Sequence, residues 1–148
     1  MSGQPTTTVE ERNLAVTRAG WAAWTSGDLE ATLAVYHPDV EFHSLPEWPE
    51  DPVYYGRAGV RRFFEQWLAM WEDWEGDMPT EYAAVGDHVM TVSDQRGRAE
   101  GSVMKVEMRV ALISLLHDGL VVHTRMFPSR DEAVAAARAE GVDFDAPR

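Results

Sequence analysis

Residues 27–49 have the sequence GDLEATLAVYHPDVEFHSLPEWP, which predicts a helix, a strand and a loop in quick succession. Gly27-Asp28 is typical of a helix stop followed by a new N-cap, so a short helix is expected over residues 29–36. Pro38 is expected to end that helix, because proline disfavours helical backbone at the residue before it. Residues 39–45, DVEFHSL, alternate as a strand does, and the prolines that follow predict an irregular loop or edge segment.

The same span places His37, Asp39, Glu41 and His43 at every second position, which raises the question of a metal site. Ligands must converge, and residues i and i+2 of a strand point the same way, so Glu41 and His43 could meet that requirement. His37 and Asp39 instead flank the proline, where a carboxylate commonly accepts hydrogen bonds from turn amides. We therefore assign His37 and Asp39 to a turn, predict no metal site, and leave His43 as the candidate for chemistry.

Helical patterns stand on both sides of this span. Upstream, Thr8 and Glu11 form a candidate capping box for a helix over residues 9–26. Downstream, a helix with an aromatic face is expected over residues 57–74, because apolar residues recur there at helical spacing: Val60, Phe63, Phe64, Trp67, Leu68, Trp71 and Trp74.

From residue 80 onward, β-type segments dominate. Turn signals at residues 86–87, 96–97 and 118–119 divide them into a meander of three or four antiparallel strands. A short alanine-rich helix follows, with Ser129 as its N-cap and Gly141 as its stop. This order of elements predicts an α+β fold in which helices cover one face of a curved sheet.

The composition is that of one globular domain. The chain has 148 residues, 45% hydrophobic and 10% aromatic, which is enough for a single core. Its 25 acidic against 13 basic residues give a formal charge of −12, which argues against binding nucleic acid or an anionic membrane. The absence of cysteine excludes disulfides, thiolate metal sites and thiol nucleophiles.

No apolar leader or membrane-length apolar run is visible, so we expect a cytoplasmic protein. The expected organisation is a flexible segment at residues 1–8, one domain at residues 9–141 and a tail at residues 142–148.

Four separated motifs resemble, in order, the SnoaL-like branch of the nuclear-transport-factor-2-like superfamily. They are the stretch quoted above, YYGRAGVRRFFEQWLAMWEDW (residues 54–74), GDHVMTVSDQRGRAEGS (residues 86–102) and HDGLVVHTRMFPSRDEAVAAA (residues 117–137). The resemblance implies a cone, in which a curved mixed or antiparallel sheet wraps around the N-terminal helices and the aromatic third helix and leaves a cavity at its wide end. It also implies a homodimer. Members include isomerases, epoxide hydrolases, polyketide cyclases, dehydratases and non-catalytic binding domains, so the fold alone does not fix the activity.

Two activities of the superfamily are disfavoured by the residues at the matching positions. Ketosteroid isomerases need an aspartate base, a tyrosine and a protonated aspartate, and here those positions hold Ser44, Gly20 and Leu112. Enzymes like limonene epoxide hydrolase use an Asp, Arg, Asp set, whereas here Arg125 is followed by Met126.

The remaining polar residues are His43, Gln95, Glu107, Arg109, His123 and Arg125, and the candidates for catalysis among them are His43, Glu107, His123 and Arg125. Glu107 shares its strand face with Arg109, and His123 shares its face with Arg125, so the two pairs could meet across the hairpin at residues 118–119. Facing the cavity, His43 or Glu107 could act as a general base and Arg125 could stabilise an oxyanion. Facing outward, the pairs form a salt-bridge lattice, which the apolar opposite face of the first strand favours.

The aromatic residues are first of all core, yet six tryptophans exceed what a small core needs. We therefore predict an apolar, aromatic-lined cavity, with space beside Gly20, that takes an apolar or aromatic small molecule. The residues expected to contact this ligand are Gly20, Trp24, Tyr36, Ser44, Tyr55, Phe63, Trp67, Trp71, Gln95 and Leu112.

Two functions stay open at this point. The first is a ligand-binding domain, or a cofactor-free isomerase, hydrolase or dehydratase driven by a group such as His43. The second is a non-catalytic module or ligand carrier, whose sheet face binds a protein partner through an exposed patch around Ile113 and Leu115.

Overall fold

The computed structural model describes residues 7–147, which contain four helices and seven strands. In chain order these are α1 (Val9–Thr25), α2 (Leu29–Leu33), β1 (Tyr36–His43), β2 (Val53–Tyr55), α3 (Gly56–Ala69), β3 (Trp71–Gly76), β4 (Glu81–Val85), β5 (His88–Ala99), β6 (Lys105–His117), β7 (Leu120–Phe127) and α4 (Arg130–Ala139).

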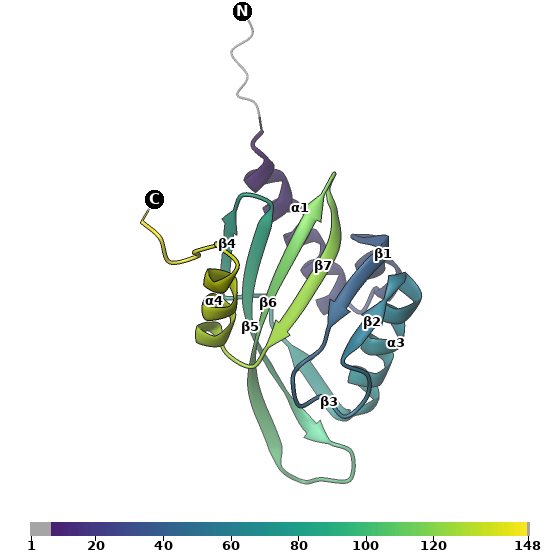
Figure 1. The fold of residues 1–148 in the computed structure, drawn as a ribbon. Coiled ribbons are helices and arrows are strands. Elements are labelled where there is room, and N and C mark those ends of the chain that lie inside the picture. Colours follow the sequence, from purple (N-terminus) through teal and green to yellow (C-terminus); the bar gives the residue numbers. More distant parts are fainter. Residues whose placement is uncertain (1–6, 148) are drawn as a thin grey trace, which may run out of the picture.

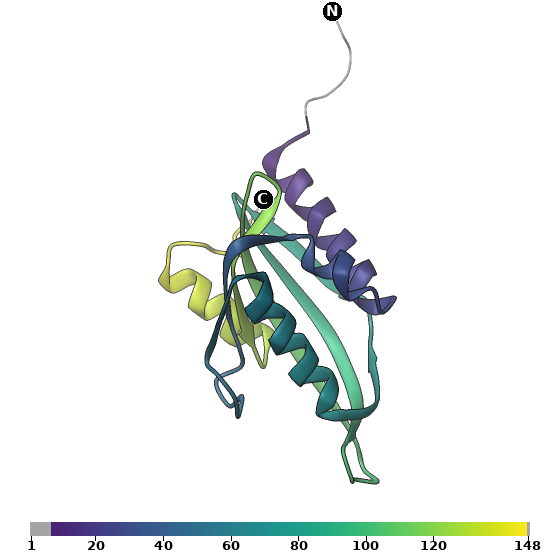
Figure 2. The same ribbon diagram turned by 90° about the vertical axis from the view of Figure 1, so that its right-hand side faces the viewer.

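The strands form one curled, mixed sheet in the order β2-β1-β7-β6-β5-β3 (Figure 1). β3 and β4 pair with successive parts of β5, and every pair is antiparallel except β1 with β7, which run parallel. The sheet wraps around α1, α2 and α3, while α4 lies on its other side (Figure 2). The α+β cone with a short C-terminal helix, predicted from the sequence, is confirmed.

Each side of the sheet has its own apolar core. The inner core joins α3 to the strands through residues at helical spacing, and Val60, Phe63 and Trp67 are at most 4% exposed. Burying a side chain of this size contributes about 1.5–3 kcal/mol. The outer core lies beneath α4, where Ala133, Val134 and Ala137 pack on the sheet. Both faces of the central strands are therefore covered, rather than one.

The predicted second helix ends earlier than expected. α2 stops at Leu33, and β1 already begins at Tyr36, before Pro38. The β1 to β7 register shifts between Tyr36 and Glu41, so the proline lies in an irregular part of the strand that tolerates a residue without an amide hydrogen. The amide of Asp39 donates to the ring of His37 at 3.0 Å, so this local bond replaces the predicted turn.

The predicted third helix is also too long. α3 ends at Ala69, and Trp71 and Trp74 belong to strand β3. Asp73 has φ +51° and the register with β5 shifts around it, so one extra residue turns both tryptophans toward the inner core. The bulge thus lets two residues that are three apart in the sequence share one face of a strand, and this is the spacing that predicted a helix.

The turn predicted at residues 96–97 is wrong, since both residues lie within β5 and the chain turns at residues 100–104. A Cβ atom at Gly97 would stand 3.2 Å from Cα of Trp74 and 3.3 Å from the Trp71 ring. Gly97 therefore allows β3 to lie close against β5.

The capping residues predicted for the first and last helices are confirmed. The Thr8 hydroxyl accepts from the amide of Glu11, the Ser129 hydroxyl accepts from the amide of Glu132, and Gly141 takes a positive φ of +86°. The flexible segment expected at residues 1–8 falls mainly on residues 1–6, which lie outside the described residues. In the predicted tail, Val142 and Phe144 pack against the outer core.

Among residues 7–147, no helix is both long enough and apolar enough to cross a membrane.

Candidate functional site

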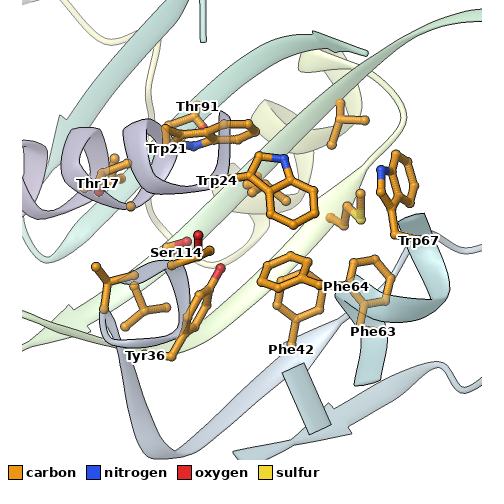
Figure 3. Close-up of a pocket in the computed structure, with 18 of the residues that line it drawn as sticks. Thr17, Trp21, Trp24, Tyr36, Phe42, Phe63, Phe64, Trp67, Thr91 and Ser114 are labelled. Atoms are coloured by element: carbon orange, nitrogen blue, oxygen red, sulfur yellow. The ribbon is translucent and has the colours of Figure 1, made fainter. Parts of the chain in front are cut away.

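A cavity lies inside the cone, between the three helices and the inner face of the sheet (Figure 3). Its volume is about 80 Å³. The lining residues are Thr17, Gly20, Trp21, Trp24, Thr32, Val35, Tyr36, Phe42, Phe63, Phe64, Trp67, Val89, Thr91, Gln95, Val110, Leu112, Ser114, Val121 and Met126.

Strand register decides which residues of β5 and β6 face this cavity. Thr91 pairs with Leu112 and Val89 pairs with Ser114, so these residues share one face of the sheet. Their chain neighbours turn to the outer face, where Ile113 lies in the core beneath α4. The prediction that the mostly apolar face of β6 lies toward the helices is confirmed for Val110, Leu112 and Ser114, which line the cavity.

Aromatic rings form the wall of the cavity near α3. The rings of Trp24 and Phe64 have centroids 4.7 Å apart, and those of Phe42 and Phe63 are 4.6 Å apart. Trp24 also meets Trp74 of β3 edge-on at 5.1 Å. Figure 3 shows Trp24 projecting from α1 toward Phe64 of α3. These ring contacts give the cavity an apolar wall.

The polar groups of the lining are uncharged. They are the hydroxyls of Thr17, Thr32, Tyr36, Thr91 and Ser114, the amide of Gln95 and the indole N–H groups of Trp21, Trp24 and Trp67. Burial raises the pKa of the Tyr36 phenol well above its ordinary value, so this hydroxyl stays protonated at neutral pH. Figure 3 shows it directed toward the side of the cavity that carries Ser114. The cavity can thus donate and accept hydrogen bonds but offers no charge.

Comparison with protein families gives a match to the SnoaL-like domain over residues 17–144. The chain belongs to the SnoaL-like family. Comparison with curated proteins found no match.

Solved structures share the fold of this SnoaL-like chain at low sequence identity. TerC, co-crystallised with polyporic acid, is 20% identical over 87% of this chain and 96% of its own, with a TM-score of 0.71. A nuclear-transport-factor-2-like protein from Burkholderia xenovorans is 24% identical over 90% of this chain and 98% of its own, with a TM-score of 0.70.

A third similar structure comes from Catenulispora acidiphila. This protein with a ketosteroid-isomerase-like fold, in complex with trimethylamine, is 18% identical over 90% of this chain and 97% of its own, with a TM-score of 0.66. At these identities the comparisons establish the fold that the SnoaL-like chain shares with them.

Most of the residues predicted to contact a ligand line the cavity: Gly20, Trp24, Tyr36, Phe63, Trp67, Gln95 and Leu112. Gly20 does so differently than expected, because the space beside it is taken by Val35, whose Cγ2 would stand 3.2 Å from an added Cβ. Its role is close packing of α1 against that side chain.

Three predicted contact residues lie elsewhere. The Ser44 hydroxyl donates to the carbonyls of Asp51 and Pro52, which holds the loop before β2. Tyr55, on the edge strand β2, is 66% exposed. Trp71 packs on Trp67 with ring centroids 5.9 Å apart and is absent from the lining.

None of the four predicted catalytic residues lines the cavity. Glu107 lies opposite Arg96, beyond the part of β6 that pairs with β7, and is exposed. His43, His123 and Arg125 gather on the outer face, because β1 and β7 pair in parallel with His43 opposite Arg125. The expected meeting of the Glu107 and His123 pairs across the hairpin is therefore absent from the structure.

The outer-face group includes Glu41, whose Cα pairs with that of His123. The rings of His43 and His123 have centroids 4.7 Å apart, and Nε2 of His123 is 4.0 Å from Oε2 of Glu41. Burial, more than the neighbouring His43 and Arg125, holds the pKa of His123 below its ordinary value, although Glu41 acts in the opposite direction. Two imidazoles and a carboxylate thus converge on the side of the sheet away from the cavity.

Several lining residues escaped the sequence prediction, among them Thr17, Phe42, Thr91 and Ser114. Two signals could have found some of them. Thr17 and Trp21 are the helical neighbours of the predicted Gly20 and Trp24 on α1, and Ser114 shares strand parity with the predicted Leu112. Phe42 is the chain neighbour of His43 on β1, so an outward His43 places Phe42 on the inner face.

Proposed function

We propose that this SnoaL-like chain binds an uncharged, largely apolar small molecule in the cavity of the cone. The observation that carries the proposal is the lining itself, which combines stacked aromatic rings with neutral hydroxyl and amide groups. Small-molecule sites usually have this form, with apolar walls and a few polar groups that fix orientation.

The lack of charged side chains in the lining indicates which class of ligand the cavity can bind. The lining contains no Asp, Glu, His, Lys or Arg, so a charged ligand would lose its hydration without gaining an ion pair. A planar ring system with one or two hydroxyl or carbonyl groups fits better, since its ring can stack on Trp24 or Phe64 while Tyr36 donates to its oxygen.

The size of the cavity requires side chains to move on binding. About 80 Å³ is roughly half the ~150 Å³ cavity that admits benzene in an engineered protein core. Trp21 and Trp24 are half-buried residues on α1, and we expect them to shift outward when a ring enters. A change in tryptophan fluorescence should therefore accompany binding.

Binding is a better-supported proposal than acid-base catalysis. General acid-base chemistry needs a group that titrates near the working pH. Tyr36 is the ionisable residue in the lining, and its raised pKa suits it to donating a hydrogen bond rather than to taking a proton. The homodimer expected from the resemblance stays a prediction, which light scattering would check.

The alternative of a protein-interaction module has less support. The apolar sheet patch that it requires was expected around Ile113 and Leu115. Ile113 is only 6% exposed because α4 packs over it, and Leu115 is half-buried.

The experiment is a binding screen of neutral aromatic, terpenoid and polyketide-like compounds, read by thermal shift and tryptophan fluorescence. Each compound is paired with a carboxylated analogue of similar shape. We expect some neutral compounds to raise the melting temperature, and their charged analogues to bind at least about tenfold more weakly. Equal binding of charged and neutral partners would contradict the proposal.

A cavity-filling variant locates the binding. Leu112→Phe adds a ring inside the cavity and is expected to abolish binding, while Leu68→Phe makes the same change on the exposed side of α3 and serves as control. Unchanged binding in Leu112→Phe would place the ligand outside the cone, and equal loss in Leu68→Phe would show that the effect is not specific to the cavity.

A further inference from the structure

We propose that Glu41, His43 and His123 form a binding site for a divalent transition-metal ion on the outer face of the sheet. This inference does not rest on the proposed ligand cavity, which lies on the opposite face.

The ligand geometry comes from strand pairing. Glu41 and His43 are two residues apart on β1 and point to the same face, and the parallel register places His123 of β7 beside Glu41. One potential ligand atom from each of the three side chains lies within 4.8 Å of the other two. Zn²⁺ holds nitrogen and oxygen ligands at about 2.0–2.2 Å, so small side-chain rotations suffice to close this set around an ion.

The chemistry of the set suits a borderline-soft cation. Two imidazoles and one carboxylate are ligands of zinc and of non-haem iron sites, whereas Mg²⁺ and Ca²⁺ prefer all-oxygen sites. Three protein ligands leave at least one coordination position for water. The side chains of His123 and Glu41 are 33% and 45% exposed, so an ion has access from solvent.

One buried nitrogen atom of the site lacks a hydrogen-bond partner. Nε2 of His43 is buried and has no hydrogen-bond partner among the described residues. Buried polar atoms are satisfied in the great majority of cases, and an orphan calls for an unseen water or ion. A metal bound to the imidazoles would remove such a deficit, either directly at Nε2 or by drawing the ring toward solvent.

The surroundings tolerate a positive ion although Arg125 is adjacent. Arg125 binds Glu140 of α4 at 2.9 Å, which offsets its charge. His123, Arg125 and Glu140 also border a hollow of about 240 Å³ between the sheet and α4, which has room for an ion with its water.

The site is physically separate from the ligand cavity. Phe42, between the two ligand positions of β1, points inward and lines the cavity. A metal on the outer face would therefore join β1 to β7 across their parallel pairing, and would not touch a guest inside the cone.

The test uses the full chain without an affinity tag, stripped with a chelator and titrated with Zn²⁺ against a chromogenic competitor. We expect one Zn²⁺ per chain. His43→Ala and His123→Ala should each weaken binding at least about tenfold. His117→Ala removes an exposed histidine at the β6 to β7 turn and should leave the affinity unchanged.

Two further measurements separate loss of the site from misfolding and report on the coordination of the ion. Circular dichroism must match the unmodified chain, and Co²⁺ should give the visible absorption of a four- or five-coordinate site in the unmodified chain but not in His123→Ala. Absence of stoichiometric Zn²⁺ binding, or equal binding by all three variants, would overturn the proposal. Either result leaves the neutral-ligand screen untouched, so failure of the two proposals is distinguishable.

Discussion

Tyr36 is the residue whose single hydroxyl group bears most directly on ligand recognition. Tyr36→Phe removes a buried donor that forms no side-chain hydrogen bond with the described residues, so stability should change little. A ligand that accepts from this hydroxyl should bind about 3- to 10-fold more weakly, which is the usual effect of one hydrogen bond. Titration by fluorescence measures the change.

Tyr55→Phe is the matched control, because its side chain is 66% exposed on the edge strand β2. An equal loss of affinity in both variants would show that the Tyr36 hydroxyl does not contact the ligand.

Gly97 tests the close approach of β3 to β5. Gly97→Ala places a Cβ 3.2 Å from the Cα of Trp74, and a backbone atom cannot rotate away. We expect a loss of about 1–3 kcal/mol in the free energy of unfolding, measured by denaturant titration. An unchanged midpoint would mean that β3 can move away without loss.

For single residues, the sequence predicted the lining of the cavity better than it predicted the catalytic residues. Strand parity placed Leu112 inward correctly, since period two holds along regular β6. The same rule could not show that His123 lies beside Glu41. That neighbourhood depends on the parallel pairing of strands separated by most of the chain.

Among the elements, α4 is held at its start by Ser129. Ser129→Ala removes the acceptor for the amide of Glu132 and should lower the free energy of unfolding by about 1 kcal/mol. Ser129→Asp keeps an acceptor at the N-cap and should retain most of the stability. Thermal denaturation of both variants checks this, and equal losses would refute the capping role.

A salt-bridge network fastens the segment after α4 to β4. Arg130 binds Glu81 at 2.8 Å and Asp145 at 2.6 Å. Hydrogen bonding to Arg130 lowers the pKa of the Asp145 carboxyl, so the stabilisation is present above the ordinary aspartate pKa of about 4 and is lost as pH falls through the folded-state pKa.

Asp145→Asn should consequently lower the melting temperature slightly at pH 7, and the gap from the unmodified chain should shrink as the pH is lowered below about 4. Melting curves across this range measure the gap. A gap that widens toward low pH would contradict the assigned direction of the pKa shift.

The elements that the sequence mispredicted share a physical cause. Trp71 and Trp74 stand three apart, as on a helix face, but the left-handed Asp73 gives a bulged strand the same spacing. Pro38 normally ends a helix, but here an irregular stretch of β1 accommodates it. In both places tertiary pairing overrode a local pattern, whereas the caps at Thr8 and Ser129 depend on local bonds and were predicted correctly.

For the whole molecule, the sheet separates two environments. Its inner face and the helices enclose a neutral, aromatic cavity, and its outer face carries the ionisable side chains of Glu41, His43, His123 and Arg125. Charged groups are thus kept out of the cavity, although both faces of the sheet carry an apolar core. This separation underlies both proposals, a neutral guest inside and a metal ion outside.

The most direct test of the central claim is a map of methyl chemical shifts in the presence of a saturating neutral hit from the screen. We expect large changes at methyl groups that line the cavity, such as those of Val110, Leu112 and Met126. Methyl groups of the outer core, such as those of Ile113 and Val134, should stay nearly unchanged. Changes confined to the outer core, or a complete absence of binding by neutral compounds, would contradict the proposal that the cavity binds a neutral ligand.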